Sequence, residues 1–288
     1  MRRHGLAALA LLLGLALPIP ARAQAPEWLE LASAREARGV QAFQAEIEYA
    51  AGRISVFPAD AGVLYDARLR YDATQFEPRR RWSIEDGRAV FRLDIDGRED
   101  VDIQVRDLSD RAGSLRLGLS RSVPTDLRLT VGGAEAKIDL GGVALSGLDL
   151  KLGAADSELR FDEPNPASMR RLTLKAAVAA FSAYGLGNAH FERLEFDGGI
   201  GDLTLDFTGE WDRSAVAKVK MGVGSLRLRV PADIGVKIRK RTFLAAFDAN
   251  GFRKVDGGYV SPNWDASDIR LDIDLEAALG SVGVTTEP

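Results

Sequence analysis

The sequence LEFDGGIGDLTL at residues 194–205 returns in the form AKVKMGVGSLRL at residues 217–228. Both stretches alternate apolar and polar residues, break at small residues, and then alternate again. Alternation with a period of two is typical of a strand that buries one face. Each stretch therefore predicts a strand, a sharp corner and a second strand.

The same pattern occurs upstream at nearly constant spacing. The leading residues lie 21, 22, 22 and 23 positions apart, at Leu129, Leu150, Leu172, Leu194 and Ala217. Related stretches begin at Ile47 and near Leu275. A repeat of about 22 residues over most of a chain is typical of a solenoid, in which each repeat packs on its neighbours. The pattern thus predicts an all-β, parallel β-solenoid.

Small residues mark the predicted corners. Where strands of successive repeats stack about 4.8 Å apart, residues in one column lie over one another, and a sharp corner leaves little space for side chains. The alignment gives a first column and, two residues later, a second: Ala134, Ala155, Ala177, Gly199 and Gly222, then Ala136, Ser157, Ala179, Gly201 and Gly224.

Outward positions in the same register carry charges of both signs. One row reads Arg128, Asp149, Thr173, Glu195 and Lys218. Opposite charges on neighbouring strands stabilise a sheet modestly, whereas Lys151 beside Lys175 is a like-charged exception. We interpret this face as a solvated surface that suppresses edge-to-edge association.

The other segments are additions to this stack. Residues 26–38 have apolar residues at helical spacing and predict a short helix or an arm that leads into the first strand. Residues 57–106 predict antiparallel hairpins, one of them turning at Asp86-Gly87. Residues 232–268 interrupt the repeat and predict an inserted hairpin that covers one end or flank of the stack.

The first 23 residues have the pattern of a secretory signal. A cationic start at Arg2 and Arg3 precedes the apolar run 6–17, and Ala21-Arg22-Ala23 offers a cleavage site. As a membrane anchor, twelve helical residues would span about 18 Å of a hydrocarbon core of about 30 Å. We therefore expect cleavage after Ala23, a mature chain in the periplasm, secreted or at the cell surface, and no later transmembrane segment. The expected domains are a signal peptide at 1–23, a β region at 24–110 and the repeat region at 111–288.

Composition excludes several kinds of chemistry. The chain has no cysteine and two histidines, which excludes disulfides, thiolate metal sites and cysteine nucleophiles. Its net charge of -4 becomes more negative once the three arginines of the signal are removed, which argues against binding of nucleic acid.

Candidate catalytic and metal sites do not accumulate enough support. His190 lies in a turn without a nucleophile motif, so we interpret it as a surface turn residue. Asp94, Asp96, Asp100 and Asp102 lack the spacing of a calcium loop and fit outward positions of a hairpin. The sequence therefore predicts no catalytic, cofactor-binding or metal-binding residues, and no enzyme.

Four features of the chain resemble the bacterial toast-rack proteins. They are the run IEYAAGRI at residues 47–54, LRYD at residues 69–72, the repeated glycine-rich corners, and the closing stretch 271–284. The same features are similar to the putative-adhesin solenoid domain and to the C-terminal domain of LiaF-like cell-wall stress response proteins. The resemblance covers roughly residues 40–285, and it implies a right-handed β-solenoid displayed outside the cytoplasm.

Two classes of function fit this interpretation. The first is a non-enzymatic cell-envelope module, adhesin-like or a stress-associated scaffold, that contacts an envelope protein or glycan. The alternative is a carbohydrate-binding or carbohydrate-active β-helix protein, in which Tyr184, Tyr259 and Trp264 stack on sugar rings. We prefer to interpret these aromatic residues as packed under the inserted hairpin.

Overall fold

The computed structural model describes residues 25–98, 113–154, 156–178 and 180–287. The predicted signal peptide, the expected strand around residues 101–105, and the corner residues Ala155 and Ala179 lie outside the described residues. Within these ranges the chain is all-β, with a single-turn helix, η2, at Leu186–Ala189. The strands are β1 (Trp28–Glu36), β2 (Ala42–Pro58), β3 (Val63–Asp72), β4 (Phe76–Glu85), β5 (Arg88–Gly97), β6 (Ser114–Leu119), β7 (Thr125–Asp139), β8 (Leu145–Ala154), β9 (Ser157–Arg160), β10 (Met169–Val178), β11 (Phe181–Tyr184), β12 (Phe191–Asp206), β13 (Ala215–Pro231), β14 (Gly235–Ala249), β15 (Arg253–Val255), β16 (Gly258–Val260) and β17 (Arg270–Glu287).

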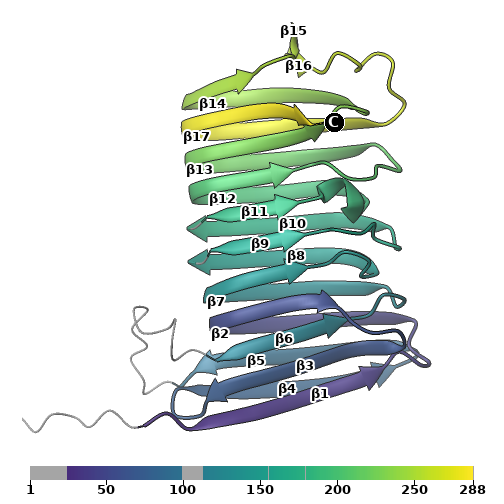
Figure 1. The fold of residues 1–288 in the computed structure, drawn as a ribbon, viewed down its shortest axis with the longest axis vertical. Coiled ribbons are helices and arrows are strands. Elements are labelled where there is room, and N and C mark those ends of the chain that lie inside the picture. The colour runs from purple at the N-terminus through teal and green to yellow at the C-terminus, as the bar shows by residue number, and fades with distance from the viewer. Residues whose placement is uncertain (1–24, 99–112, 155, 179, 288) are drawn as a thin grey trace, which may run out of the picture.

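The strands form a tall stack in which parallel neighbours follow one another (Figure 1). The first half of β2 pairs with β5 and its second half pairs with β6, so the long strands contribute to two sides of the stack. On the first side the parallel order is β5, β2, β7, β8, β10, β12, β13, β17 and β14. On the second side β9 and β11 take the places of β8 and β10.

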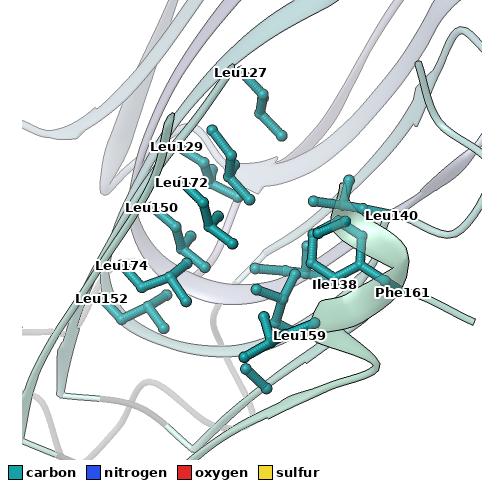
Figure 2. Packing of buried hydrophobic residues seen from close by; sticks show 14 of the residues in the cluster. Leu127, Leu129, Ile138, Leu140, Leu150, Leu152, Leu159, Phe161, Leu172 and Leu174 are labelled. Carbon is teal, nitrogen blue, oxygen red and sulfur yellow. The ribbon is translucent and has the colours of Figure 1, made fainter. Parts of the chain in front are cut away.

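A narrow apolar core fills the space between the two sides. Figure 2 shows leucines from β7, β8 and β10 along one wall and Ile138, Leu140, Leu159 and Phe161 along the other. These side chains are buried because alternate residues of each strand point inward. Burying a leucine contributes about 1.5–3 kcal/mol, so each added strand extends the core by several such increments.

The predicted register is confirmed at three steps and wrong at one. Leu129 pairs with Leu150, and Leu172 pairs with Leu194, which in turn pairs with Ala217. Between β8 and β10, however, Leu150 pairs with Leu174, so this repeat is two residues longer than the sequence alignment allows. A slip of two residues keeps every apolar side chain on the buried face, whereas a slip of one would reverse them.

This slip changes the corner columns but not the outward row. Gly132 and Gly153, rather than Ala134 and Ala155, continue the column of Ala177, Gly199 and Gly222. The row Arg128, Asp149, Thr173, Glu195 and Lys218 is confirmed, as is the like-charged neighbour pair of Lys151 and Lys175.

The N-terminal segment is a strand and not a helix. β1 pairs antiparallel with β3, and Leu31 lies opposite Leu69. The hairpin of β4 and β5 is confirmed, with positive φ angles of 48° at Asp86 and 73° at Gly87 in its turn. Residues 63–65 and 69–71, expected in separate hairpin strands, belong to the single strand β3.

The inserted segment is more than a hairpin. β14 forms the outermost parallel strand of the stack, and the C-terminal strand β17 lies between β13 and β14 (Figure 1). Only β15 and β16 make a small antiparallel hairpin beyond β14. Across the ranges that the structure describes, no helix is long and apolar enough to cross a membrane.

Candidate binding surface

The corner between the two sides of the stack is built from backbone packed against backbone. A Cβ atom on Gly222 would lie 2.6 Å from the carbonyl oxygen of Gly199. Two residues further along the strand, Gly224 has a φ of +136°, and a Cβ there would lie 1.9 Å from the carbonyl oxygen of Gly201. Glycine is required at such a position because it alone tolerates both the angle and the approach. The two glycine columns of the corner therefore have no space for a large side chain.

An open furrow of about 1420 Å³ follows this corner along the stack. It crosses β7, β8, β10, β12, β13, β17 and β14, which at about 4.8 Å per strand is a length of about 29 Å. Backbone and small residues of the corner column form much of its lining, namely Gly132, Gly153, Ala177, Gly199, Gly222 and Ala278. The furrow can therefore accommodate an extended chain that runs across the strands.

A row of charged residues forms one wall of the furrow. The residues are in register on neighbouring strands: Thr130, Lys151, Lys175, Asp197, Lys220, Glu276 and Arg241. Lys151 lies 3.7 Å from Asp149, and Arg241 forms an ion pair with Glu276. Among the described residues, Lys175 and Lys220 have no carboxylate within 4.0 Å. The carboxylate of Asp197 likewise has no cation within 4.0 Å in this part of the chain. The wall is therefore cationic overall, and within the described residues two of its ammonium groups, on either side of Asp197 in the row, form no ion pair.

An exposed apolar ridge follows the corner one residue beyond the furrow floor. Ile200, Val223, Leu279 and Leu244 pair with one another in sequence along the stack. Their exposed fractions are 56%, 38%, 44% and 64%, and Phe243 at the end of the furrow is 84% exposed. Contiguous exposed apolar side chains are common at interaction sites, which makes this ridge part of the candidate surface.

The stack ends at β14, whose outer edge is only partly covered. The hairpin pairs with Lys237 and Ile238, and from Arg239 to Ala249 this edge has no partner strand in the described part of the chain. Lys240 occupies an inward position opposite Leu275. Inward charges on an edge strand oppose the addition of a further strand. The furrow and ridge, rather than this edge, are therefore the candidate binding surface.

The aromatic residues expected to bind sugar do not share one surface. Tyr184 is on β11, where the guanidinium of Arg160 lies 4.8 Å from its ring centroid. Tyr259 is on β16 and packs against Phe247, and Trp264 follows that strand, with Arg270 5.1 Å above its ring. The strands β12, β13, β17 and β14 separate Tyr184 from the other two.

His190 lies in the predicted turn, after η2, but its side chain is only 15% exposed, so the interpretation as a surface residue is wrong. Its Nδ1 lies 3.0 Å from the carbonyl oxygen of Asn165 and 4.0 Å from Asp212. The pKa of the Asp212 carboxyl is lowered, chiefly by a hydrogen bond from Arg213 and further by the charge of His190. The geometry holds the loop together and brings no nucleophile to the imidazole in the described residues.

The structure describes two of the four aspartates considered as calcium ligands. Asp94 and Asp96 lie on β5, where Asp96 pairs with Arg79, and Asp100 and Asp102 lie outside the described residues. In the ranges that the structure covers, His, Asp and Glu side chains do not gather in threes at a distance suited to a metal ion.

Sequence reasoning missed the apolar ridge. Its signal is a bulky aliphatic residue between two small ones, as in GIG at 199–201, GVG at 222–224 and ALG at 278–280. The sequence pattern predicts that the corner accepts only small residues, but the bend turns the central residue of each triplet outward.

The chain is similar to known proteins in sequence and in fold. The family model described as the N-terminal domain of toast_rack, DUF2154, matches residues 30–175 and 170–229. A putative cell adhesion protein from Clostridium sporogenes ATCC 15579 has a solved structure with 17% identity and a TM-score of 0.49, and the match covers 91% of this chain and 100% of that chain. A putative adhesin from Bacteroides fragilis NCTC 9343 matches with 11% identity and a TM-score of 0.34, over 90% of this chain and 97% of that chain. A putative adhesin from Parabacteroides distasonis ATCC 8503 matches with 10% identity and a TM-score of 0.32, over 90% and 98%. No curated protein matches the chain.

Proposed function

This chain belongs to the toast-rack family, and from that premise we propose that it is a non-enzymatic, extracytoplasmic, adhesin-like module that binds another protein along its corner furrow. The observation that carries the proposal is the open furrow of about 1420 Å³ beside an exposed apolar ridge. A floor of glycine, alanine and backbone provides shape and apolar contact, and it offers few groups for acid–base catalysis.

The proposal takes the stack to be a right-handed β-solenoid with repeats of about 22 residues. Parallel pairing of Leu129 with Leu150 and of Leu172 with Leu194 supports the repeat. Connections between parallel strands of one sheet are right-handed in about 98% of cases, which supports a right-handed coil of the chain around the stack.

An extracytoplasmic location is part of the same proposal. The signal pattern of residues 1–23 supports it, with cleavage after Ala23. The proposed organisation is then a short β region at 24–110 that begins the stack and a repeat region at 111–288 that carries the furrow.

The walls of the furrow indicate the chemistry of the partner. The ridge offers apolar contact, and Lys175 and Lys220 offer unpaired ammonium groups on the opposite wall. An extended polypeptide with aliphatic and acidic side chains satisfies both walls at once. A neutral glycan would leave the ammonium groups unpaired, and the aromatic residues that could stack on it are dispersed.

Site-specific photocrosslinking tests the proposal. Benzoylphenylalanine in place of Phe243 puts the probe at the end of the furrow, and the same residue in place of Lys137, an exposed position on the other side of the corner, is the matched control. We expect a protein crosslink in envelope fractions from position 243 alone, reduced at least fivefold by Lys175→Glu with Lys220→Glu.

Three results would contradict it. Equal crosslinking from both positions would show non-specific contact. Crosslinking that is unchanged by the two charge reversals would show that the cationic wall does not contribute to binding. Binding on a glycan array without any protein crosslink would favour the carbohydrate alternative.

A further inference from the structure

Two arginines lie side by side on the outer face of the stack, away from the furrow. Arg171 on β10 pairs in register with Arg193 on β12, and both are exposed. Each directly precedes a buried leucine in its strand, so both side chains point outward from the same face. Like charges directly opposite one another on neighbouring strands destabilise a sheet. We call these two residues the arginine pair.

The carboxylates near the arginine pair are engaged elsewhere. Asp126 lies 3.8 Å from Arg128, and Glu192 lies 4.0 Å from Arg213. Within the described residues, no carboxylate comes within 4.0 Å of either guanidinium of the pair. The flanking positions in the row are Gly147 and Val216, which bring no charge. Among the described residues, these two neighbouring cations therefore have no ion-pair partner.

An in-register arginine pair elsewhere in the chain shows the contrast. Arg68 on β3 lies opposite Arg116 on β6. There Arg68 is 3.1 Å from Asp66, and the guanidinium of Arg116 lies 5.1 Å from the ring centroid of Phe57. Both of these guanidiniums therefore have partners within the chain.

A hollow of about 470 Å³ lies beside the arginine pair. Its lining also includes Asp126, Ser146, Gly147, Arg170 and Glu192. Gly147 stands next to Arg171, because the residues that follow them, Leu148 and Leu172, are paired. A Cβ on Gly147 would approach no atom closer than 3.6 Å, so close packing does not demand glycine here. Its missing side chain leaves space beside a guanidinium.

We propose that this hollow binds an oxyanion carried by a hydroxyl-bearing molecule, with a phosphorylated sugar as the representative ligand. Guanidinium groups bind phosphate oxygens in a planar, two-point geometry. The arginine pair and Arg170 supply these donors at one end. Ser146 supplies an acceptor for sugar hydroxyls at the rim, and so do the second carboxylate oxygens of Asp126 and Glu192, whose other oxygens lie near Arg128 and Arg213. The site is separate from the furrow, so this proposal is independent of the proposed protein partner.

Calorimetric titration at low ionic strength tests the site. The probes are glucose 6-phosphate, glucose and inorganic phosphate. We expect glucose 6-phosphate to bind more tightly than inorganic phosphate, and glucose not to bind. Arg171→Gln with Arg193→Gln should weaken binding of glucose 6-phosphate at least tenfold, whereas Arg68→Gln with Arg116→Gln should leave it unchanged.

A second variant separates loss of binding from loss of folding. Gly147→Gln fills the hollow next to the arginine pair with a neutral side chain whose Cβ meets no atom closer than 3.6 Å, so it should weaken binding while leaving the melting temperature unchanged. Absence of glucose 6-phosphate binding to the wild type, or equal affinity of the wild type and the arginine variant, would overturn the proposal. If inorganic phosphate bound as tightly as glucose 6-phosphate, the proposed contacts to the sugar would be wrong.

Discussion

Substitution of Gly224 by alanine tests the corner most sharply. Gly224 has a φ of +136°, and the new Cβ would lie 1.9 Å from the carbonyl oxygen and 2.9 Å from the carbonyl carbon of Gly201. Both atoms are backbone, so no side chain can rotate away. Backbone strain contributes about 1–3 kcal/mol, and forcing β12 and β13 apart adds about 1–3 kcal/mol. We expect a total loss of about 2–6 kcal/mol.

The same strand system offers a matched control. A Cβ on Gly283 of β17 would have no atom within 4 Å, and this glycine has no positive φ, so Gly283→Ala should change stability by less than about 0.5 kcal/mol. Urea unfolding followed by circular dichroism measures both variants. A loss below about 1 kcal/mol for Gly224→Ala, or equal losses for the two variants, would refute the corner as described.

Three further substitutions test the loop, the surface and the core. Asn165→Ala should lower the free energy of unfolding in urea by about 2–4 kcal/mol, because the buried side-chain amide forms hydrogen bonds with backbone groups at 2.9, 3.0 and 3.1 Å. Asn250→Ala, at an exposed position, should lower it by less than about 0.5 kcal/mol. Equal losses for the two variants would contradict this. A hydrogen bond from Arg239 lowers the pKa of Asp274, so the ionised carboxylate stabilises the fold above about pH 4, and this contribution is lost as pH falls through the lowered pKa. Asp274→Asn should therefore reduce the loss of unfolding free energy between neutral and acid pH, by less than about 1 kcal/mol. An unchanged dependence of stability on pH would contradict this. Leu174→Ala should lower the free energy of unfolding by about 2–5 kcal/mol, and a loss under about 1 kcal/mol would place this side chain outside the core.

The repeat was predictable because its signal is local and periodic. Alternation along β12 and β13 marks the buried side chains, and the spacing of Leu172 and Leu194 matches their pairing. The slip between Leu150 and Leu174 was not predictable, because a shift of two residues preserves the alternation. Its cause lies in the longer connection from β9 to β10, where apolar periodicity carries no register information.

Elements at the ends of the stack were harder to predict. Trp28 and Leu31 on β1 have helical spacing, yet tertiary pairing with β3 determines their conformation. The position of β17 between β13 and β14 depends on contacts between strands remote in sequence. For the same reason, the arginine pair and the unpaired lysines become visible only when the register of neighbouring strands is known.

Disulfide trapping tests the stacking of the furrow wall most directly, since the chain has no native cysteine. The structure places Lys151 opposite Lys175, and neighbouring strands lie about 4.8 Å apart, within the Cα separation of about 4.4–6.8 Å that a disulfide needs. Lys151→Cys with Lys175→Cys should therefore oxidise to an internal disulfide, as measured by loss of thiol labelling. Lys151→Cys with Thr173→Cys, the pair that an uninterrupted 22-residue spacing would bring together, should stay reduced. Oxidation of the second pair in place of the first would contradict the register on which the furrow wall depends.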